Sequence, residues 1–407
     1  MIKIKKYKIR FPGFGWILTL FFILFFVIQL KNNRFELNDF KVYYLGMQNF
    51  LKGDVIYGIP FGLDSGFYKY SPFALLPFTV FYYMPYLIAA VLFYFLVAAA
   101  IGITLYKIYH LLLQVFNFKD VKQNKVLYFT TLILLNHFYR ELHLGNVNML
   151  LLLLYMLSLG EIYKNKQYTA GILIGIGLLF KLHFIVLLPV LLLFRKFKAS
   201  ATVLITFVAG LLLPVLFIGF EANNALLKAW LEAMKGHNSN ISMSSDTIYA
   251  WINKLLTVFG MQQQGILYSL LILISIGFFF LWIILKEKHK LAMHSEIQRF
   301  TFVYLLAIAF IPIITVTDSE HFLFSLPIVM FSLFLLFSKR YIAVWKKAVI
   351  ILAYVMYGGN WHDLWGHSIS VFFTQNGILG LGNILLIGML VWIVYGGNDP
   401  QKERMAK

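Results

Sequence analysis

Long runs without a charged residue are the feature that most limits how this chain can fold. Only 13% of its residues are charged, against about 25% in a typical soluble protein. The charge-free runs lie at about 13–30, 84–106, 126–138, 148–160, 168–180, 182–194, 199–220, 264–285, 300–317, 322–338, 348–357 and 377–398. Such runs are typical of helices in lipid. We expect an all-α polytopic membrane protein with about 12 transmembrane helices, forming a single integral-membrane domain over residues 1–407.

Basic residues are distributed unevenly among the segments that join these runs. If the N-terminal MIKIKKYKIR is cytosolic and the spans alternate, the cytosolic segments hold most of the 35 Lys and Arg and a minority of the 17 acidic residues. Lys and Arg are retained on the cytosolic side of a membrane. The net charge of +18 therefore indicates topology, and we expect no nucleic-acid partner. The pattern predicts cytosolic tails at both ends.

Four of the runs are too short to cross a bilayer alone. About 13 residues of helix rise roughly 20 Å, whereas the hydrocarbon core is about 30 Å thick. The loops that join these runs in pairs, 140–143 and 181–183, should therefore lie below the outer membrane surface. Polar backbone at that depth is tolerated around a hydrated cavity lined by protein. The sequence thus predicts a pocket in the outer leaflet, lined by the basic residues Arg140 and Lys181.

Residues able to do chemistry collect in the segments that this topology places outside. They include Asp39 shortly after the first apolar run, several amides and most of the histidines. The candidate site residues are Asp39, Tyr43, Tyr68, Lys69, Tyr70, Arg140, His143, Asn146, Asn148, Lys181, His183, Asn240, Glu320, His321 and Trp361.

Each of the principal candidates also has a purely structural interpretation. Asp39 has the residue type of a helix N-cap. Arg140 and Lys181 have side chains that can anchor in lipid phosphate. His321 has acidic neighbours with which it can form an interfacial hydrogen-bond cluster. Trp361 suits the aromatic belt of a membrane interface.

Several classes of site are absent from the sequence. The chain has no cysteine, which excludes disulfides and thiolate metal sites. It has no glycine-rich phosphate loop, nucleophile elbow or dinucleotide fingerprint. Asp318, Glu320 and His321 offer oxygen and nitrogen ligands, but their spacing matches no metal motif. We expect no metal and no cofactor.

An ordered set of short segments resembles glycosyltransferase family 87. The set is NDFKVYY, LKGDVIYG, YKYSPFALLPF, LGNVNMLLLLL, AGILIGIGLLFKLHFIVLLPVLLL and TDSEHFLFSLP. The similarity covers about residues 37–330. Asn146 stands where the family usually has Gln, Leu182 and His183 follow the lysine where Pro is common, and the late segment lacks the usual Trp and second His.

The resemblance implies a GT-C-like enzyme whose extracytoplasmic loops and juxtamembrane helices form the active-site cavity. It implies inverting transfer of a hexose or pentose, with mannose favoured, from a polyprenyl-phosphate donor to a lipid or glycan acceptor outside the membrane. It also implies that Asp39 is the general base. A carboxylate beside lipid is costly and is therefore by default functional. Arg140 and Lys181 would hold the donor phosphate, with His321 as a further phosphate or sugar contact.

Rival classes are distinguished by where the polar residues lie. A lipid or glycan flippase places ionisable residues near the bilayer midplane, whereas the runs here have none. A glycan polymerase or ligase usually has a large outer loop late in the chain, whereas the largest predicted outer loops here are 31–70 and about 221–263. A non-catalytic assembly subunit is a further alternative. The pattern does not specify the sugar, the acceptor, the oligomeric state or the exact span boundaries.

Overall fold

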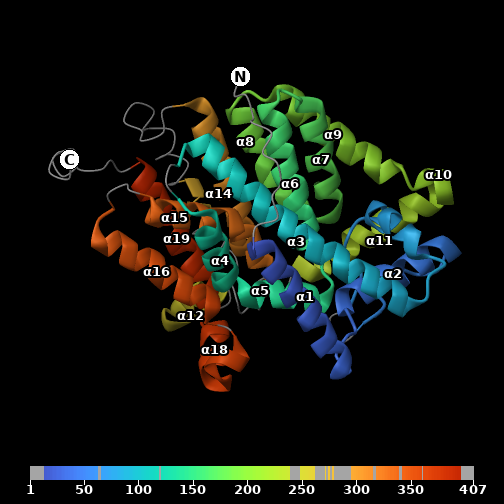
Figure 1. Cartoon of the computed structure of the whole chain (residues 1–407). Helices are drawn as coiled ribbons and strands as arrows, with labels where there is room; N and C mark the ends of the chain where they lie inside the picture. The colour runs from blue at the N-terminus through green and yellow to red at the C-terminus, as the bar shows by residue number, and fades with distance from the viewer. Residues whose placement is uncertain are drawn as a thin grey trace. The chain divides into compact units, whose positions relative to one another are not determined.

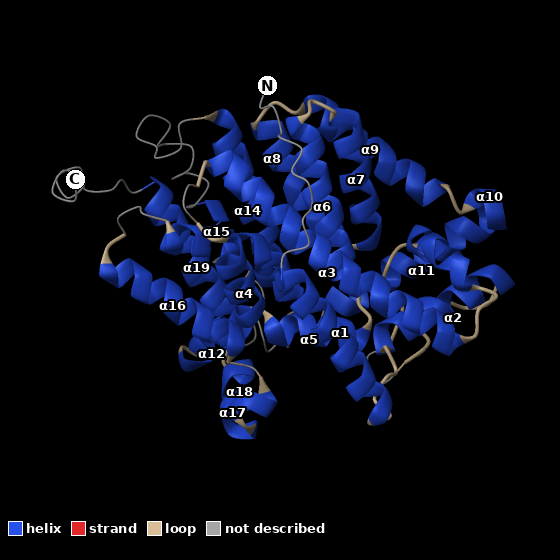
Figure 2. Ribbon diagram, in the orientation of Figure 1, coloured by secondary structure: helices blue, strands red, loops and turns tan. Residues whose placement is uncertain are grey.

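The computed structural model describes residues 13–62, 66–118, 121–238, 248–261, 295–314, 318–338, 342–359 and 361–395, with a few positions between 271 and 278. Nearly all of these residues are helical (Figure 1). Figure 2 shows helices joined by loops, and the pairing of extended chain among the described residues is the isolated bridge between Pro60 and Phe67. The prediction of an all-α fold is confirmed.

Six helices in the described part of the chain are long and apolar enough to cross a membrane. They are Gly13–Lys31, Tyr86–Phe116, Phe197–Ile218, Glu296–Ile313, Ser319–Phe337 and Ile378–Tyr395. A seventh is added if Leu135–Leu144 and Asn148–Tyr163, bent by 113°, form one broken span. This confirms a polytopic membrane protein, but the predicted number of about 12 spans is not confirmed. Some apolar runs fold as short helices, such as Gln167–Phe180 and Leu182–Leu193.

Several of these helices expose large apolar side chains. On α9 (Phe197–Leu212), Ile205 is 67% exposed and Leu204 and Val208 are also exposed. Trp16 on α1 (Gly13–Lys31) is 69% exposed. Extended apolar surfaces of this kind are rare on soluble monomers and mark contact with a partner or lipid. These faces suit a membrane environment.

The contacts within the chain divide it into two compact units. The first unit comprises residues 1–107 and 138–238, and the second comprises 108–137 and 239–407. The expectation of a single integral-membrane domain over 1–407 stays a prediction.

The first unit contains the helices that carry most of the candidate site. Its elements are α1, α2 (Asn38–Lys52), the 3-10 helix η1 (Pro72–Phe81), most of α3 (Tyr86–Phe116), most of α5 (Leu135–Leu144), α6 (Asn148–Tyr163), α7 (Gln167–Phe180), η2 (Leu182–Val186), α8 (Leu187–Leu193), α9, α10 (Val215–Ile218) and α11 (Phe220–Asn238). Phe40 of α2 stacks on Phe93 of α3, with ring centroids 4.5 Å apart. This aromatic contact fixes the start of α2 against α3.

Glycines on α7 allow this helix to pack closely against α9. A Cβ atom at Gly175 would lie 2.6 Å from Cβ of Thr206 and 3.0 Å from the backbone oxygen of Val203. A Cβ at Gly171 would lie 2.6 Å from the backbone oxygen of Ala199. Gly171 and Gly175 form a GxxxG pattern, which lets helix backbones approach each other in membranes. The pattern sets the distance between α7 and α9.

The second unit packs apolar helices around a small polar core. Its elements are the end of α3, α4 (Gln123–Ile133), the start of α5, α12 (Ile248–Val258), α14 (Glu296–Ile314), the 3-10 helix η5 (Ser319–Ser325), α15 (Leu326–Phe337), α16 (Val344–Gly358), α17 (His362–Trp365), α18 (His367–Gln375) and α19 (Ile378–Tyr395). Asn383 on α19 accepts hydrogen bonds from Ser325 and Tyr357 and donates one to the backbone oxygen of Ala309. Such polar contacts join helices inside a membrane.

We expect Gly175→Ala to destabilise the protein, because its Cβ would meet atoms bound directly to the backbone of α9. The cost of overpacking is typically about 1–3 kcal/mol. Thermal unfolding of the detergent-solubilised protein measures this loss. Gly160→Ala on α6 is the matched control, since a Cβ there meets nothing within 4 Å. Equal unfolding temperatures for the two variants would contradict the packing argument.

Candidate active site

The first turn of α2 places Asp39 at the start of a helix. The N-cap position belongs to Leu37, so Asp39 does not have the N-cap role that its residue type allows. Leu37 is fully buried and adopts the left-handed conformation, with φ of 46°. A non-glycine residue in this conformation is strained by about 1–3 kcal/mol, and such strain often accompanies functional sites. Asp39 thus follows a strained turn that its buried surroundings maintain.

A glycine turn between α5 and α6 brings an amide to this acid. Gly145 has φ of +66°, and a Cβ there would lie 3.0 Å from the Cβ atoms of Leu37 and Phe40. Glycine is therefore required both by the backbone conformation and by the close approach of α2. Directly after this turn, Asn146 Nδ2 donates a hydrogen bond to Asp39 Oδ2 at 2.5 Å. The bond fixes the orientation of the half-buried carboxylate.

Glu141 was not among the residues predicted for the site, and the structure places it at the centre of the polar contacts. It is fully buried on α5. Its Oε1 accepts the backbone N–H of Met149 at 2.8 Å, and its Oε2 accepts Asn148 Nδ2 at 2.9 Å. The carboxylate therefore lies at the N-terminus of α6, where the helix dipole favours negative charge. The sequence signal that could have identified Glu141 is its position as an acid, in a chain with few acids, directly after the candidate cation Arg140.

Lys181 ends α7 in an extended conformation and reaches the same place. Its side chain is only 4% exposed. Its Nζ donates a hydrogen bond to Asn148 Oδ1 at 2.5 Å. Burial and an amide partner within the protein do not fit the interpretation of Lys181 as an anchor in lipid headgroups.

Two tyrosines extend these contacts toward α2. The hydroxyl groups of Tyr43 and Tyr70 lie 3.2 Å apart, and Lys181 Nζ lies 5.9 Å from the centre of the Tyr70 ring. Burial raises the pKa of Tyr43 well above 10, and the neighbouring Tyr70 and the carboxylates of Asp39 and Glu141 raise it further. Tyr43 is therefore a neutral hydroxyl near pH 7 and is suited to hydrogen bonding rather than to acting as a base.

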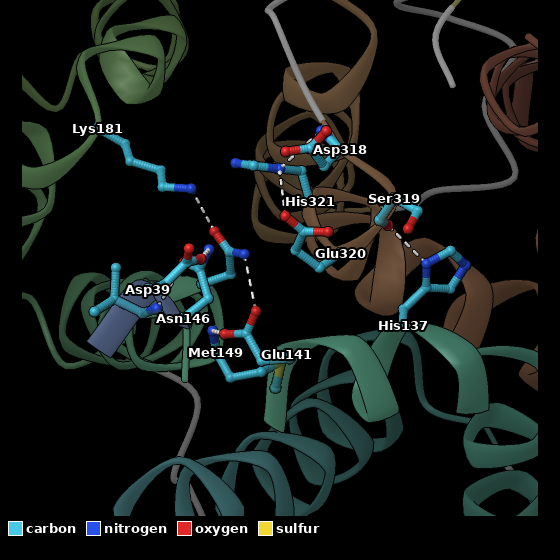
Figure 3. Close-up of polar contacts among 12 residues, drawn as sticks. Asp39, His137, Glu141, Asn146, Met149, Lys181, Asp318, Ser319, Glu320 and His321 are labelled. Atoms are coloured by element: carbon cyan, nitrogen blue, oxygen red, sulfur yellow. Dashed lines mark hydrogen bonds and ion pairs between the residues drawn. The ribbon is translucent and has the colours of Figure 1, made fainter. Parts of the chain in front are cut away.

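We call this group the polar cluster; its members are Asp39, Tyr43, Tyr70, Glu141, Asn146, Asn148 and Lys181. All seven belong to the first unit. Figure 3 shows Asp39, Glu141, Asn146 and Lys181 directed toward one another from α2, α5, the α5–α6 turn and the end of α7. The structure thus brings together six residues predicted from the sequence and adds Glu141.

Tyr68 and Lys69 lie beside the cluster in the segment before η1. The Tyr68 hydroxyl is buried and donates to the backbone oxygen of Ser71 at 3.0 Å. The backbone oxygen of Lys69 accepts a hydrogen bond from Trp230 Nε1 at 3.1 Å. These contacts hold the segment that presents Tyr70.

The other predicted residues of the first unit have different surroundings. Arg140 was predicted in a loop, but it lies within helix α5, half-buried, directly before Glu141. His143 Nδ1 lies 3.3 Å from Gln29 Oε1 of α1, so this ring faces α1. His183 is half-buried in η2.

The second unit contains Glu320 and His321 at the start of η5. His321 Nδ1 lies 3.3 Å from the backbone nitrogen of Asp318 and 3.7 Å from Glu320 Oε1. The shorter contact requires Nδ1 to accept the N–H of Asp318, so the ring proton is on Nε2. The contacts fit a helix cap, which supports the structural interpretation of His321 as part of a hydrogen-bond cluster.

Buried His137 connects this segment to the rest of the second unit (Figure 3). Its Nδ1 lies 2.7 Å from the backbone oxygen of Ser319, and its Nε2 lies 3.0 Å from that of Tyr357. Because both partners are acceptors, the ring satisfies both only when both nitrogens carry a proton.

Two predicted residues remain. Trp361 is half-buried next to the short helix α17. Asn240 lies outside the described residues. Among the described residues, no three His, Cys, Asp or Glu are grouped so that they could hold a metal ion. The expectation that the protein needs no metal or cofactor stays a prediction.

The sequence also matches a known protein family. The model of glycosyltransferase family 87 matches residues 67–312. The chain belongs to glycosyltransferase family 87. This confirms the family predicted from the sequence, and a family 87 member is a membrane glycosyltransferase that uses a sugar donor and an acceptor. No curated protein and no solved structure matches the chain.

The residues that match family 87 cover most of the polar cluster. The matched range includes Glu141, Asn146, Asn148 and Lys181, whereas Asp39 precedes it. Glu320 and His321 follow its end. The contact between Asn146 and Asp39 therefore joins a residue inside the matched range to one outside it.

We expect Gly145→Ala to weaken both stability and activity, because the added Cβ would press on the start of α2 and displace Asn146 from Asp39. The loss in unfolding free energy should exceed that of Gly58→Ala. Gly58 also has a positive φ, of +80°, but a Cβ there meets nothing within 4 Å. The control carries the conformational strain, about 1 kcal/mol, without the collision. Chemical denaturation in detergent measures the unfolding free energy of both variants. Equal losses of unfolding free energy would show that the contact with α2 is unimportant.

Proposed function

We propose that this chain moves a hexose or pentose, with mannose favoured, from a polyprenyl-phosphate donor to a lipid or glycan acceptor at the outer face of a bacterial-type inner membrane. One observation carries the proposal: a carboxylate, Asp39, and a buried cation, Lys181, lie in one polar cluster where apolar helices break. Family 87 membership supplies the reaction class.

Asp39 is assigned as the general base. In the proposed step it takes the proton from the acceptor hydroxyl while that oxygen attacks C1 of the sugar. The C1–O bond to the polyprenyl phosphate breaks on the opposite face, so the anomeric centre is inverted. The hydrogen bond from Asn146 supports this role, because a base works best when it is held in one orientation.

Lys181 is assigned to the donor phosphate. The leaving phosphate gains negative charge as the C1–O bond breaks, and a fixed cation in a water-poor site stabilises that charge strongly. Lysine acts as a point charge, whereas an arginine such as Arg140 can bind two phosphate oxygens at once. Tyr70, next to Lys181, and Tyr43 are assigned to hydrogen bonding with sugar or phosphate.

The lipid-linked donor is supported by the surroundings of the cluster. Glu141 and Asn148 lie on the bent helix pair α5–α6, and Lys181 lies between the short apolar helices Gln167–Phe180 and Leu182–Leu193. The sequence has no phosphate loop of the kind that binds ATP, and outside the cell a nucleotide sugar would be absent. A prenyl chain is compatible with the exposed apolar surface of this protein.

We expect Asp39→Asn to leave folding intact and to lower transfer by a factor of about 10² or more, as for loss of a general base. The measurement incubates purified protein with a panel of polyprenyl-phosphate sugars and detects released polyprenyl phosphate. Asp54→Asn, which changes an exposed acid beyond α2, is the matched control and should retain activity. Normal transfer by Asp39→Asn would remove Asp39 from the mechanism.

We expect Lys181→Ala to raise the KM for the polyprenyl-phosphate sugar, since it removes the cation that binds the donor phosphate, and to lower kcat, since the charge gained by the leaving phosphate loses its stabilisation. Lys164→Ala, at an exposed lysine in the connection between α6 and α7, should change neither value. Unchanged donor dependence in Lys181→Ala would contradict the phosphate role. Transfer from nucleotide sugars by the unaltered protein would overturn the donor assignment.

A further inference from the structure

We propose that Glu141 is a positioning residue that acts through the amide of Asn148 to hold Lys181 for the donor phosphate. The proposal deepens the proposed function and rests on it for the identity of the ligand. The bonds that carry it lie within the first unit and run from α6 to Glu141, from Glu141 to Asn148, and from Asn148 to Lys181.

The position of Glu141 requires a group that accepts two hydrogen bonds. One oxygen receives the backbone N–H of Met149, and the other receives the amide nitrogen of Asn148. A carboxylate has two acceptor oxygens and, when ionised, no donor. Full burial of an unpaired charge is costly. The two donors and the N-terminus of α6 offset this cost by stabilising the negative charge of Glu141.

The charge of Glu141 determines which way the amide of Asn148 points. Its Nδ2 faces the carboxylate, and its Oδ1 faces the ammonium of Lys181. The reversed amide would place NH₂ against the ammonium and oxygen against the carboxylate, and both contacts would be repulsive. Glu141 therefore orients the amide of Asn148 so that its oxygen faces Lys181, and this oxygen fixes the position of Lys181 Nζ.

Glutamine cannot replace Glu141 without a conflict. If the glutamine of Glu141→Gln turns its NH₂ toward Met149, two donors face each other. If it turns its NH₂ toward Asn148, that amide has to reverse and present its own NH₂ to Lys181. We expect Glu141→Gln to raise the donor KM about tenfold or more, because hydrogen bonds to charged groups are worth this much, and to lower kcat with it, because Lys181 also stabilises the leaving phosphate.

The second residue of the pair offers a test by charge exchange. Asn148→Asp alone places two carboxylates against each other and should impair the protein in the same way. In Glu141→Gln/Asn148→Asp every bond is restored. The new glutamine accepts from Met149 and donates to the new aspartate, which accepts in turn from Lys181. We expect the double variant to return the donor KM to within about threefold of the original.

Chemical labelling of Lys181 needs no substrate, so it tests the role of Glu141 even if the proposed function is wrong. The rate at which an amine-specific reagent modifies Lys181, followed by peptide mass spectrometry, should rise several-fold in each single variant and fall again in the double variant. Glu161→Gln, at a partly exposed glutamate on α6 paired with Lys164, is the control and should change neither readout.

The outcomes are distinct. If the unaltered protein releases no polyprenyl phosphate, the proposed function fails, and the labelling of Lys181 alone decides the role of Glu141. If Glu141→Gln does not fold, the double variant still decides, since it carries the same glutamine. Unchanged labelling in Asn148→Asp, or a double variant that is unfolded or no better than either single variant, would overturn the proposal.

Discussion

The positive charge on Lys181 has to be balanced inside an apolar protein, and the polar cluster is arranged around that requirement. Removing an ammonium from water costs several kcal/mol unless polar partners replace the water. Asn148 supplies an oxygen, and Glu141 supplies the negative charge behind it. Glu141 is stabilised in turn by the N-terminus of α6. Because each group depends on the next, α5, α6 and the end of α7 have to meet at one point.

The backbone makes this meeting possible through breaks in otherwise regular helices. Gly145 turns the chain by a positive φ between α5 and α6, which differ in direction by 113°. Close packing of the α7 glycines against α9 fixes the helix that ends at Lys181. The strained turn at Leu37 begins α2 directly before Asn38 and Asp39. Rigid packing around a few irregular turns is a common way to hold a site in place.

Family membership supports the class of reaction, and the geometry of the polar cluster supports the roles of its residues. The matched range includes the buried cation and its partners but begins after Asp39. The contact from Asn146, which lies inside that range, connects Asp39 to the same cluster. His321, in contrast, has the contacts of a helix cap. Asp39 and His321, both candidates from the sequence, therefore have different surroundings.

The sequence by itself determined the class of protein, the all-α fold and the family, because long charge-free runs and ordered short motifs are local properties of the chain. It also named Asp39, Asn146, Asn148 and Lys181 as candidate site residues. Only the tertiary structure decided that Glu141 joins them, that Arg140 lies within a helix and that His143 faces α1. These outcomes depend on where helices break and how sharply they turn. Such breaks are fixed by packing between distant segments, as where Gly145 meets Leu37 and Phe40, and this packing has no signature in the local pattern.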